Sequence, residues 1–156
     1  NRTSRCFADG ADDHGSIVPS HDAAGREVLG PTDPAAAPED SLRGIVHAEW
    51  EALGLPSAPT IGQNGVHASA SPFEGLAERT NWLQLPLQAD PFARRLLAGG
   101  IPTATIKAWS VDPQVVLADG SGKKGSLFDQ LEDMDLDECV ATCVKLYEAQ
   151  PTDARI

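Results

Sequence analysis

The chain has 156 residues, of which 41% are hydrophobic and 5% aromatic, and it contains 12 prolines and 14 glycines. This composition predicts one small globular region with long irregular segments. The net charge of −11 argues against binding nucleic acids or anionic membranes through bulk electrostatics. A nucleotide could still bind, because it needs only a local pair of cations such as Arg26 and Arg43.

Membrane and disulfide signals are weak throughout the sequence. No stretch approaches the roughly 20 apolar residues of a membrane span, and the first residues lack the charged-then-apolar pattern of a secretory signal. Three cysteines without a repeated spacing do not form a disulfide framework. These observations favour a cytoplasmic, reducing setting.

The first half of the chain predicts little regular structure. Residues 1–21 are polar and are expected to be irregular. Asp22 can cap a short helix over 23–29, which Gly30 would end. Three prolines then predict a loop over 31–40.

An apolar pattern follows in the segment 45–61. Its first part predicts an amphipathic helix over 45–53, ended by Gly54. His47 and Glu51 are four residues apart on that helix, which suits a surface pair or half of a metal site. Without further ligands nearby, the surface pair is the preferred interpretation.

The strongest local signal surrounds a histidine in the middle of the chain. The tetrapeptide SPFE at 71–74 has a serine cap, a proline at the first helical position and a glutamate three residues after the serine, which predicts a helix over 72–83. Glu78 on that helix can turn back toward the loop that holds His67. A histidine with such a carboxylate has the ingredients of an oriented nucleophile or general base. The alternative is a surface histidine beside a helix cap.

The last part of the chain predicts a mixed extension. A helix is expected over 92–98, two strands over 101–109 and 114–118 as a hairpin, and a final amphipathic helix from Asp135 or Asp137 to about residue 150 that could dock a partner. The glycine- and lysine-rich run at 120–126 lacks the spacing of a phosphate-binding loop. A flexible basic turn is therefore expected there.

Four segments occur in an order that resembles one enzyme family. They are REVLGPTDP at 26–34, SLRG at 41–44, NGVHAS at 64–69, and Glu78 inside the following helix. Each pattern is weak alone, but the order and most separations resemble the catalytic half of a nucleoside diphosphate kinase. The residues of the first two segments resemble the divergent branch found in cilia and flagella more than they resemble the housekeeping enzymes.

The resemblance implies a ping-pong phosphotransfer. His67 would attack the terminal phosphate of a magnesium-bound nucleoside triphosphate and pass it to a nucleoside diphosphate. Glu78 would accept a hydrogen bond from the other ring nitrogen, with Ser69 close by. The nucleotide would be held by Arg26, Thr32 and Arg43 at the phosphates and by Asn64 at the sugar. Magnesium would enter with the nucleotide, and no protein metal site is implied.

The chain also departs from the family in three places. Ala70 stands where the housekeeping enzymes have an aspartate, and the connector between Arg43 and Asn64 is about twice the usual length. The family's first strands and helices have no counterpart before Asp22.

The predicted fold is α+β, a partial ferredoxin-like nucleoside diphosphate kinase domain with a C-terminal α/β extension. The expected parts are an irregular segment 1–21, a catalytic half 22–84 with an insertion at about 45–61, and an extension 85–156.

Two hypotheses follow from the resemblance. One is an active kinase that binds nucleoside di- and triphosphates and neither nucleic acid nor membranes. The other is a non-catalytic scaffold in a large assembly such as a ciliary or flagellar axoneme, with other protein chains as partners. Retention of His67 and its neighbours favours the enzyme, and the missing first half favours the scaffold.

Overall fold

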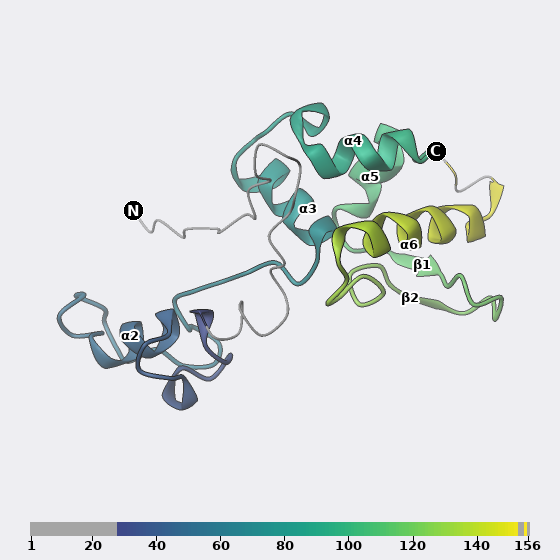
Figure 1. Cartoon of the computed structure of the whole chain (residues 1–156). Coiled ribbons are helices and arrows are strands. Elements are labelled where there is room, and N and C mark those ends of the chain that lie inside the picture. Colours follow the sequence, from purple (N-terminus) through teal and green to yellow (C-terminus); the bar gives the residue numbers. More distant parts are fainter. Residues whose placement is uncertain (1–27, 153–154, 156) are drawn as a thin grey trace. The chain divides into compact units, whose positions relative to one another are not determined.

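The computed structural model describes residues 28–152 and 155 (Figure 1). The described chain is of mixed α+β type, with helices and one two-stranded sheet. It divides into two compact units, unit 1 with residues 28–68 and unit 2 with residues 69–152 and 155. The expected catalytic half, 22–84, is therefore shared between the two units. None of the described helices is long and apolar enough to cross a membrane.

Unit 1 is built around helix α2, Leu42–Ala48, which follows the 3-10 helix η1, Pro34–Ala36. Ser41 caps α2, because its hydroxyl oxygen accepts a hydrogen bond from Gly44 N at 3.1 Å and donates one to the Pro38 carbonyl at 2.7 Å. The helix expected over 45–53 is therefore wrong in its bounds. The cap at Ser41 starts the helix three residues earlier, and turns occupy 49–54.

Unit 2 contains four α-helices and the sheet. The elements are α3 (Pro72–Trp82), η2 (Leu87–Ala89), α4 (Pro91–Ala98), α5 (Thr103–Trp109), β1 (Gln114–Val116), β2 (Lys124–Ser126) and α6 (Leu136–Ala149). Helix α4 contacts α3 and α6, and α6 also contacts α3 and β1. The helices predicted over 72–83 and 92–98 are thus confirmed to within a residue at each end.

The core of unit 2 gathers around Phe73, whose side chain is fully buried. Its ring lies 6.2 Å from the ring of Phe92, 6.1 Å from that of Trp109 and 6.3 Å from that of Phe128. Such separations and tilted orientations are the ones that aromatic rings prefer. Helices α3, α4 and α5 are therefore held by a shared aromatic cluster.

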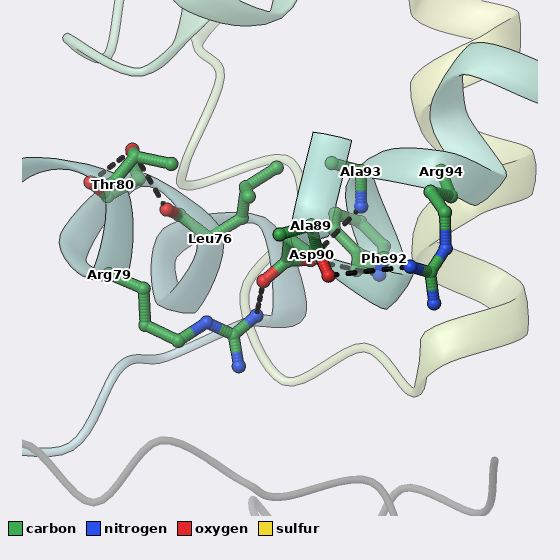
Figure 2. A network of polar contacts seen from close by, with 9 residues as sticks. Leu76, Arg79, Thr80, Ala89, Asp90, Phe92, Ala93 and Arg94 are labelled. Carbon is green, nitrogen blue, oxygen red and sulfur yellow. Dashed lines mark hydrogen bonds and ion pairs between the residues drawn. The ribbon is translucent and has the colours of Figure 1, made fainter. Parts of the chain in front are cut away.

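A buried ion pair joins α3 to α4 (Figure 2). Asp90 caps α4, with one carboxylate oxygen accepting hydrogen bonds from Phe92 N at 2.9 Å and Ala93 N at 3.1 Å. Its other oxygen lies 2.5 Å from Nη2 of Arg79 on α3. The Asp90 side chain is only 5% exposed, so its charge depends on these partners.

The predicted hairpin of 101–109 with 114–118 is wrong. Residues 103–109 form α5, and β1 instead pairs antiparallel with β2, in the register Gln114↔Ser126. Within α5, Ile106 and Trp109 are buried three residues apart, which is a helical spacing. The run at 120–126 includes the exposed turn between the strands and β2 itself.

The C-terminal helix does not present a free docking face. Cys139, Cys143 and Leu146 of α6 are buried in the core of unit 2. After the helix, the side chain of Gln150 reaches β1, where its amide accepts a hydrogen bond from Val116 N and donates one to Val116 O, each at 3.0 Å. The apolar face expected to dock a partner is thus used within the unit.

Candidate functional site

The start of α3 is fixed by its capping residues. The Ser71 hydroxyl accepts a hydrogen bond from Glu74 N at 3.1 Å, which confirms the predicted cap. The Glu74 carboxylate reaches back to the backbone amide of Ala70. In the predicted capping box the glutamate would bond to the amide of the serine itself. Here it bonds one residue earlier, so it also holds the peptide that enters the helix.

A second carboxylate lies one turn further along the same face of α3. The Ser69 hydroxyl donates a hydrogen bond of 2.8 Å to Oε2 of Glu78, and both residues are half-buried. Gly75 lies between the two glutamates, and a Cβ there would be 3.5 Å from the Ser69 hydroxyl oxygen. Ser69 therefore packs over the first turns of α3, with its hydroxyl bonded to Glu78.

This pairing matters because Ser69 follows His67 by two residues. The resemblance implies that the serine lies close to the glutamate that orients the catalytic histidine. Within unit 2 the Ser69 to Glu78 hydrogen bond has that arrangement. His67 itself is exposed and lies at the end of unit 1.

Metal-ligating residue types also occur in this stretch of the chain, namely His67, Glu74 and Glu78. The histidine ends unit 1, whereas both glutamates lie on α3 of unit 2. One oxygen of each carboxylate already accepts a hydrogen bond within unit 2, from Ala70 N and from the Ser69 hydroxyl. We assign no metal to these residues, and magnesium borne by the nucleotide stays the expectation.

In unit 1 the guanidinium of Arg43 connects two distant backbone segments. Nη1 donates a hydrogen bond of 2.6 Å to the Gly30 carbonyl, and Nη2 donates one of 3.1 Å to the Val66 carbonyl. Nε is buried and has no acceptor among the described residues. Burial lowers the pKa of the Arg43 guanidinium, which remains a cation at neutral pH. Arg43 therefore joins the backbone at Gly30 to the backbone at Val66.

The other expected nucleotide ligands of unit 1 lie on the same two segments. Asn64 is half-buried and its Nδ2 donates a long hydrogen bond of 3.4 Å to the Thr32 carbonyl. Thr32 is exposed. The structure thus joins Asn64 to the Thr32 backbone, while Arg43 contacts Gly30 and Val66 on the same two segments. Arg26 lies outside the described residues.

Sequence reasoning missed how closely the SLRG segment packs. A Cβ on Gly44 would lie 1.9 Å from the Pro38 carbonyl oxygen, and one on Gly30 would lie 2.5 Å from the Ser41 hydroxyl. Gly30 also has a φ of +81°, which side chains disfavour. Serine is a preferred N-cap residue, so Ser41 is the signal that could have located the start of α2.

Comparison with protein-family models, with curated proteins and with solved structures found no match for this chain. The resemblance noted above therefore depends on the residues themselves. Its local features fall into two groups, Ser69 with Glu78 in unit 2 and Thr32, Arg43 and Asn64 in unit 1.

Proposed function

We propose that this chain carries the phosphotransfer site of a nucleoside diphosphate kinase-like protein, with His67 as the phosphate carrier. The observation that supports it best is the 2.8 Å hydrogen bond that Ser69 donates to Glu78. Ser69 lies two residues after the histidine in the sequence. The resemblance implies that Ser69 lies close to Glu78, the residue that would orient the histidine ring.

In the proposed first half-reaction, a ring nitrogen of neutral His67 attacks the terminal phosphorus of a nucleoside triphosphate. The bond between that phosphorus and the bridging oxygen breaks, and the nucleoside diphosphate leaves with the electron pair. In the second half-reaction, a different nucleoside diphosphate attacks the phosphohistidine and leaves as a triphosphate. The histidine side chain is exposed, so a nucleotide can reach it.

The residue types that the resemblance assigns to the site suit this chemistry. Glu78 would stabilise the positive charge that develops on the ring during attack, because a carboxylate bonded to the second nitrogen favours the cationic ring. The nucleotide would carry its own Mg²⁺. Arg26 would supply positive charge to the phosphates, and Asn64 would contact the sugar.

The proposal also assigns parts of the chain to a partial kinase domain. We propose that unit 1 and α3 correspond to the catalytic half of the ferredoxin-like kinase fold, and that 85–156 is an extension. The first strands of that fold would come from another segment or a partner chain.

The test is labelling with γ-labelled ATP and Mg²⁺, followed by an assay for acid-labile, base-stable phosphate on the protein. We expect label on the wild type that is absent from His67→Gln and that transfers to added GDP. His47→Gln, which changes a half-buried histidine of α2, is the matched control and should label normally. A folded wild type that takes up no label would overturn the proposal.

The scaffold hypothesis is favoured by a different observation in unit 2. Trp82 ends α3, and Leu83 and Leu85 lie just beyond it; their exposed fractions are 70%, 55% and 44% in that order. Neighbouring exposed apolar side chains of this size are typical of protein contacts. A ciliary or flagellar assembly is the setting that the resemblance implies for such a contact.

The two hypotheses can be separated with one variant. Trp82→Ser with Leu83→Ser removes apolar surface without touching Ser69 or Glu78. If the chain is a kinase, the double variant should take up label as the wild type does. Co-sedimentation with isolated axonemes that the double variant loses would support the scaffold.

A further inference from the structure

The contacts of the Arg43 guanidinium differ from those of a phosphate-binding arginine. Two of its nitrogens donate to backbone carbonyls and the third is buried. Only the second N–H of each terminal nitrogen is left for a ligand. A phosphate-binding arginine usually offers a fork of two parallel N–H groups to the anion.

We infer that Arg43 is a positioning residue, which fixes the backbone of His67 by clamping the Val66 carbonyl to the Gly30 carbonyl. This inference rests on the proposed role of His67 in phosphotransfer. It assigns Arg43 a different task from the one implied by the resemblance, where an arginine at this place holds phosphate.

The geometric reason is the planarity of the peptide bond. The Val66 carbonyl, the His67 amide and the Cα atom of His67 lie in one rigid plane. A hydrogen bond that holds the Val66 oxygen therefore limits where the Cα of His67 can be, and with it the origin of the imidazole side chain. Gly65, which precedes Val66, has a φ of +80°. A glycine backbone can rotate easily unless its neighbours are held.

The other end of the clamp is equally well placed. The Gly30 carbonyl belongs to the peptide that leads into Pro31 and Thr32, so Arg43 ties the Thr32 loop to the His67 loop. The Asn64 to Thr32 hydrogen bond joins the same two loops a second time. That second bond is long and exposed, so Arg43 is the stronger of the two ties.

The helix that carries Arg43 is itself anchored. Ser41 is fully buried and caps α2, and Gly44 packs directly against the Pro38 carbonyl. The start of α2 is therefore fixed to the loop before it. Arg43 lies on this first turn, so its hydrogen bonds hold both carbonyls relative to the start of α2.

Arg43→Lys tests the clamp because lysine keeps the charge. A lysine binds a phosphate as a point charge, but it cannot span two carbonyls with a planar fork. If Arg43 positions His67, we expect Arg43→Lys to lower the rate of phosphohistidine formation at saturating ATP roughly 10- to 100-fold, with little change in the half-saturating ATP concentration. A near-normal rate with a raised half-saturating concentration would identify a phosphate ligand and overturn the inference.

Arg94→Lys is the matched control. Arg94 is an exposed arginine of α4 that also donates to one backbone carbonyl, that of Ala89, at 3.4 Å. Its replacement should leave both the rate and the half-saturating concentration unchanged.

A second measurement does not depend on activity. In isotope-labelled protein, the carbonyl carbons of Gly30 and Val66 should both shift in Arg43→Lys, while those of unit 2 keep their positions. In the wild type, the same two signals should persist unchanged when Mg²⁺ and ATP are added. Release of either carbonyl on adding nucleotide, or no shift in the variant, would overturn the clamp.

The outcomes separate the two proposals. A wild type that takes up no label, but whose two carbonyl signals respond to Arg43→Lys, removes the kinase function and retains the clamp as a structural device. Normal labelling with unresponsive carbonyls removes the clamp and leaves the kinase. Should Arg43→Lys fail to fold, the nucleotide titration of the wild type still decides.

Discussion

Units 1 and 2 are stabilised by different kinds of interaction, unit 2 by a buried apolar core and unit 1 by hydrogen bonds to backbone carbonyls. Among the described residues, the buried apolar core lies in unit 2, from Phe73 to Leu146. In the described part of unit 1, the buried residues are small or cyclic: Gly30, Pro34, Ser41, Gly44 and Pro59. Unit 1 is held by hydrogen bonds to backbone carbonyls instead, from Ser41 and Arg43.

The contrast has an energetic consequence. Burying a large apolar side chain contributes about 1.5–3 kcal/mol, whereas a net intramolecular hydrogen bond contributes about 1 kcal/mol. We therefore expect unit 2 to be the stable part and unit 1 to open more readily. Elements that bind ligands are commonly drawn from the less stable part of a protein.

The largest expected effect is in the core of unit 2. Phe73→Ala removes a fully buried ring that contacts three other rings, and it should lower the free energy of unfolding of unit 2 by about 3–5 kcal/mol. Urea unfolding followed by the amide signals of each unit would measure this. Leu83→Ala, at a 55% exposed side chain, should change it by less than about 0.5 kcal/mol. If Phe73→Ala lowered the free energy of unfolding of unit 2 by less than about 1 kcal/mol, the apolar core would not be what stabilises unit 2.

A pair of glycine substitutions gives a smaller effect that differs in sign between the units. Ala is ordinarily better than Gly in a helix by about 1 kcal/mol. Gly75→Ala in α3 meets only ordinary contacts and should stabilise unit 2 by about 0.5–1 kcal/mol. Gly44→Ala in α2 would place a Cβ 1.9 Å from the Pro38 carbonyl and should destabilise unit 1 by about 1–3 kcal/mol.

Amide hydrogen exchange of α2 and α3 would read out both substitutions. The comparison is sharpened if protection falls in α2 with Gly44→Ala and rises in α3 with Gly75→Ala. Stabilisation by Gly44→Ala would mean that the close approach at Pro38 is not what holds unit 1.

The last expected effect is a pH dependence of unit 2 that appears only at alkaline pH. The hydrogen bond with Cys139 and burial both raise the pKa of the Cys143 thiol. An unfolded thiol ionises near pH 9.0, so this contribution is complete below that pH. It is lost as the pH rises further, by up to about 1.4 kcal/mol per pH unit.

The measurement is urea unfolding of unit 2 at increasing alkaline pH, in the wild type and in Cys143→Ala. We expect the difference in stability between the two proteins to shrink above pH 9.0, because only the wild type has this thiol to ionise on unfolding. The α2 signals of unit 1 should not follow this difference. Parallel curves for the two proteins would contradict the expectation.

The sequence predicted those elements whose signals are local. The starts of α3 and α4 follow from Ser71 and Asp90, each directly before a proline, and each cap is made by its own side chain. The α+β class also followed from the pattern. Such caps need no knowledge of distant residues.

Elements set by distant contacts were missed. The segment 103–109 contains two Thr, one Ile and one Trp, residue types that favour strands. As a helix it buries Ile106 and Trp109 in the core. The strand β2, Lys124–Ser126, consists of Lys, Gly and Ser and so has no apolar signal, and it forms by pairing with β1 across the turn. The contacts of Arg43 were missed for a related reason, since backbone carbonyls carry no signature in the sequence.

For the candidate site, the neighbourhood of Ser69 and Glu78 was expected from the resemblance, and the two residues are hydrogen-bonded within unit 2. Thr32 and Asn64 were expected as ligands through their side chains. In the structure the Asn64 side chain instead donates to the Thr32 backbone, which ties two loops together.

Gln150 has a consequence for how this chain meets other chains. Its side-chain amide occupies both the N–H and the C=O of Val116, as the backbone of a neighbouring strand would. At that residue β1 cannot recruit a strand from a second molecule, the step by which exposed edges seed ordered aggregates. Gln150, a single residue just beyond the end of α6, thus blocks the addition of a further strand at this position of β1.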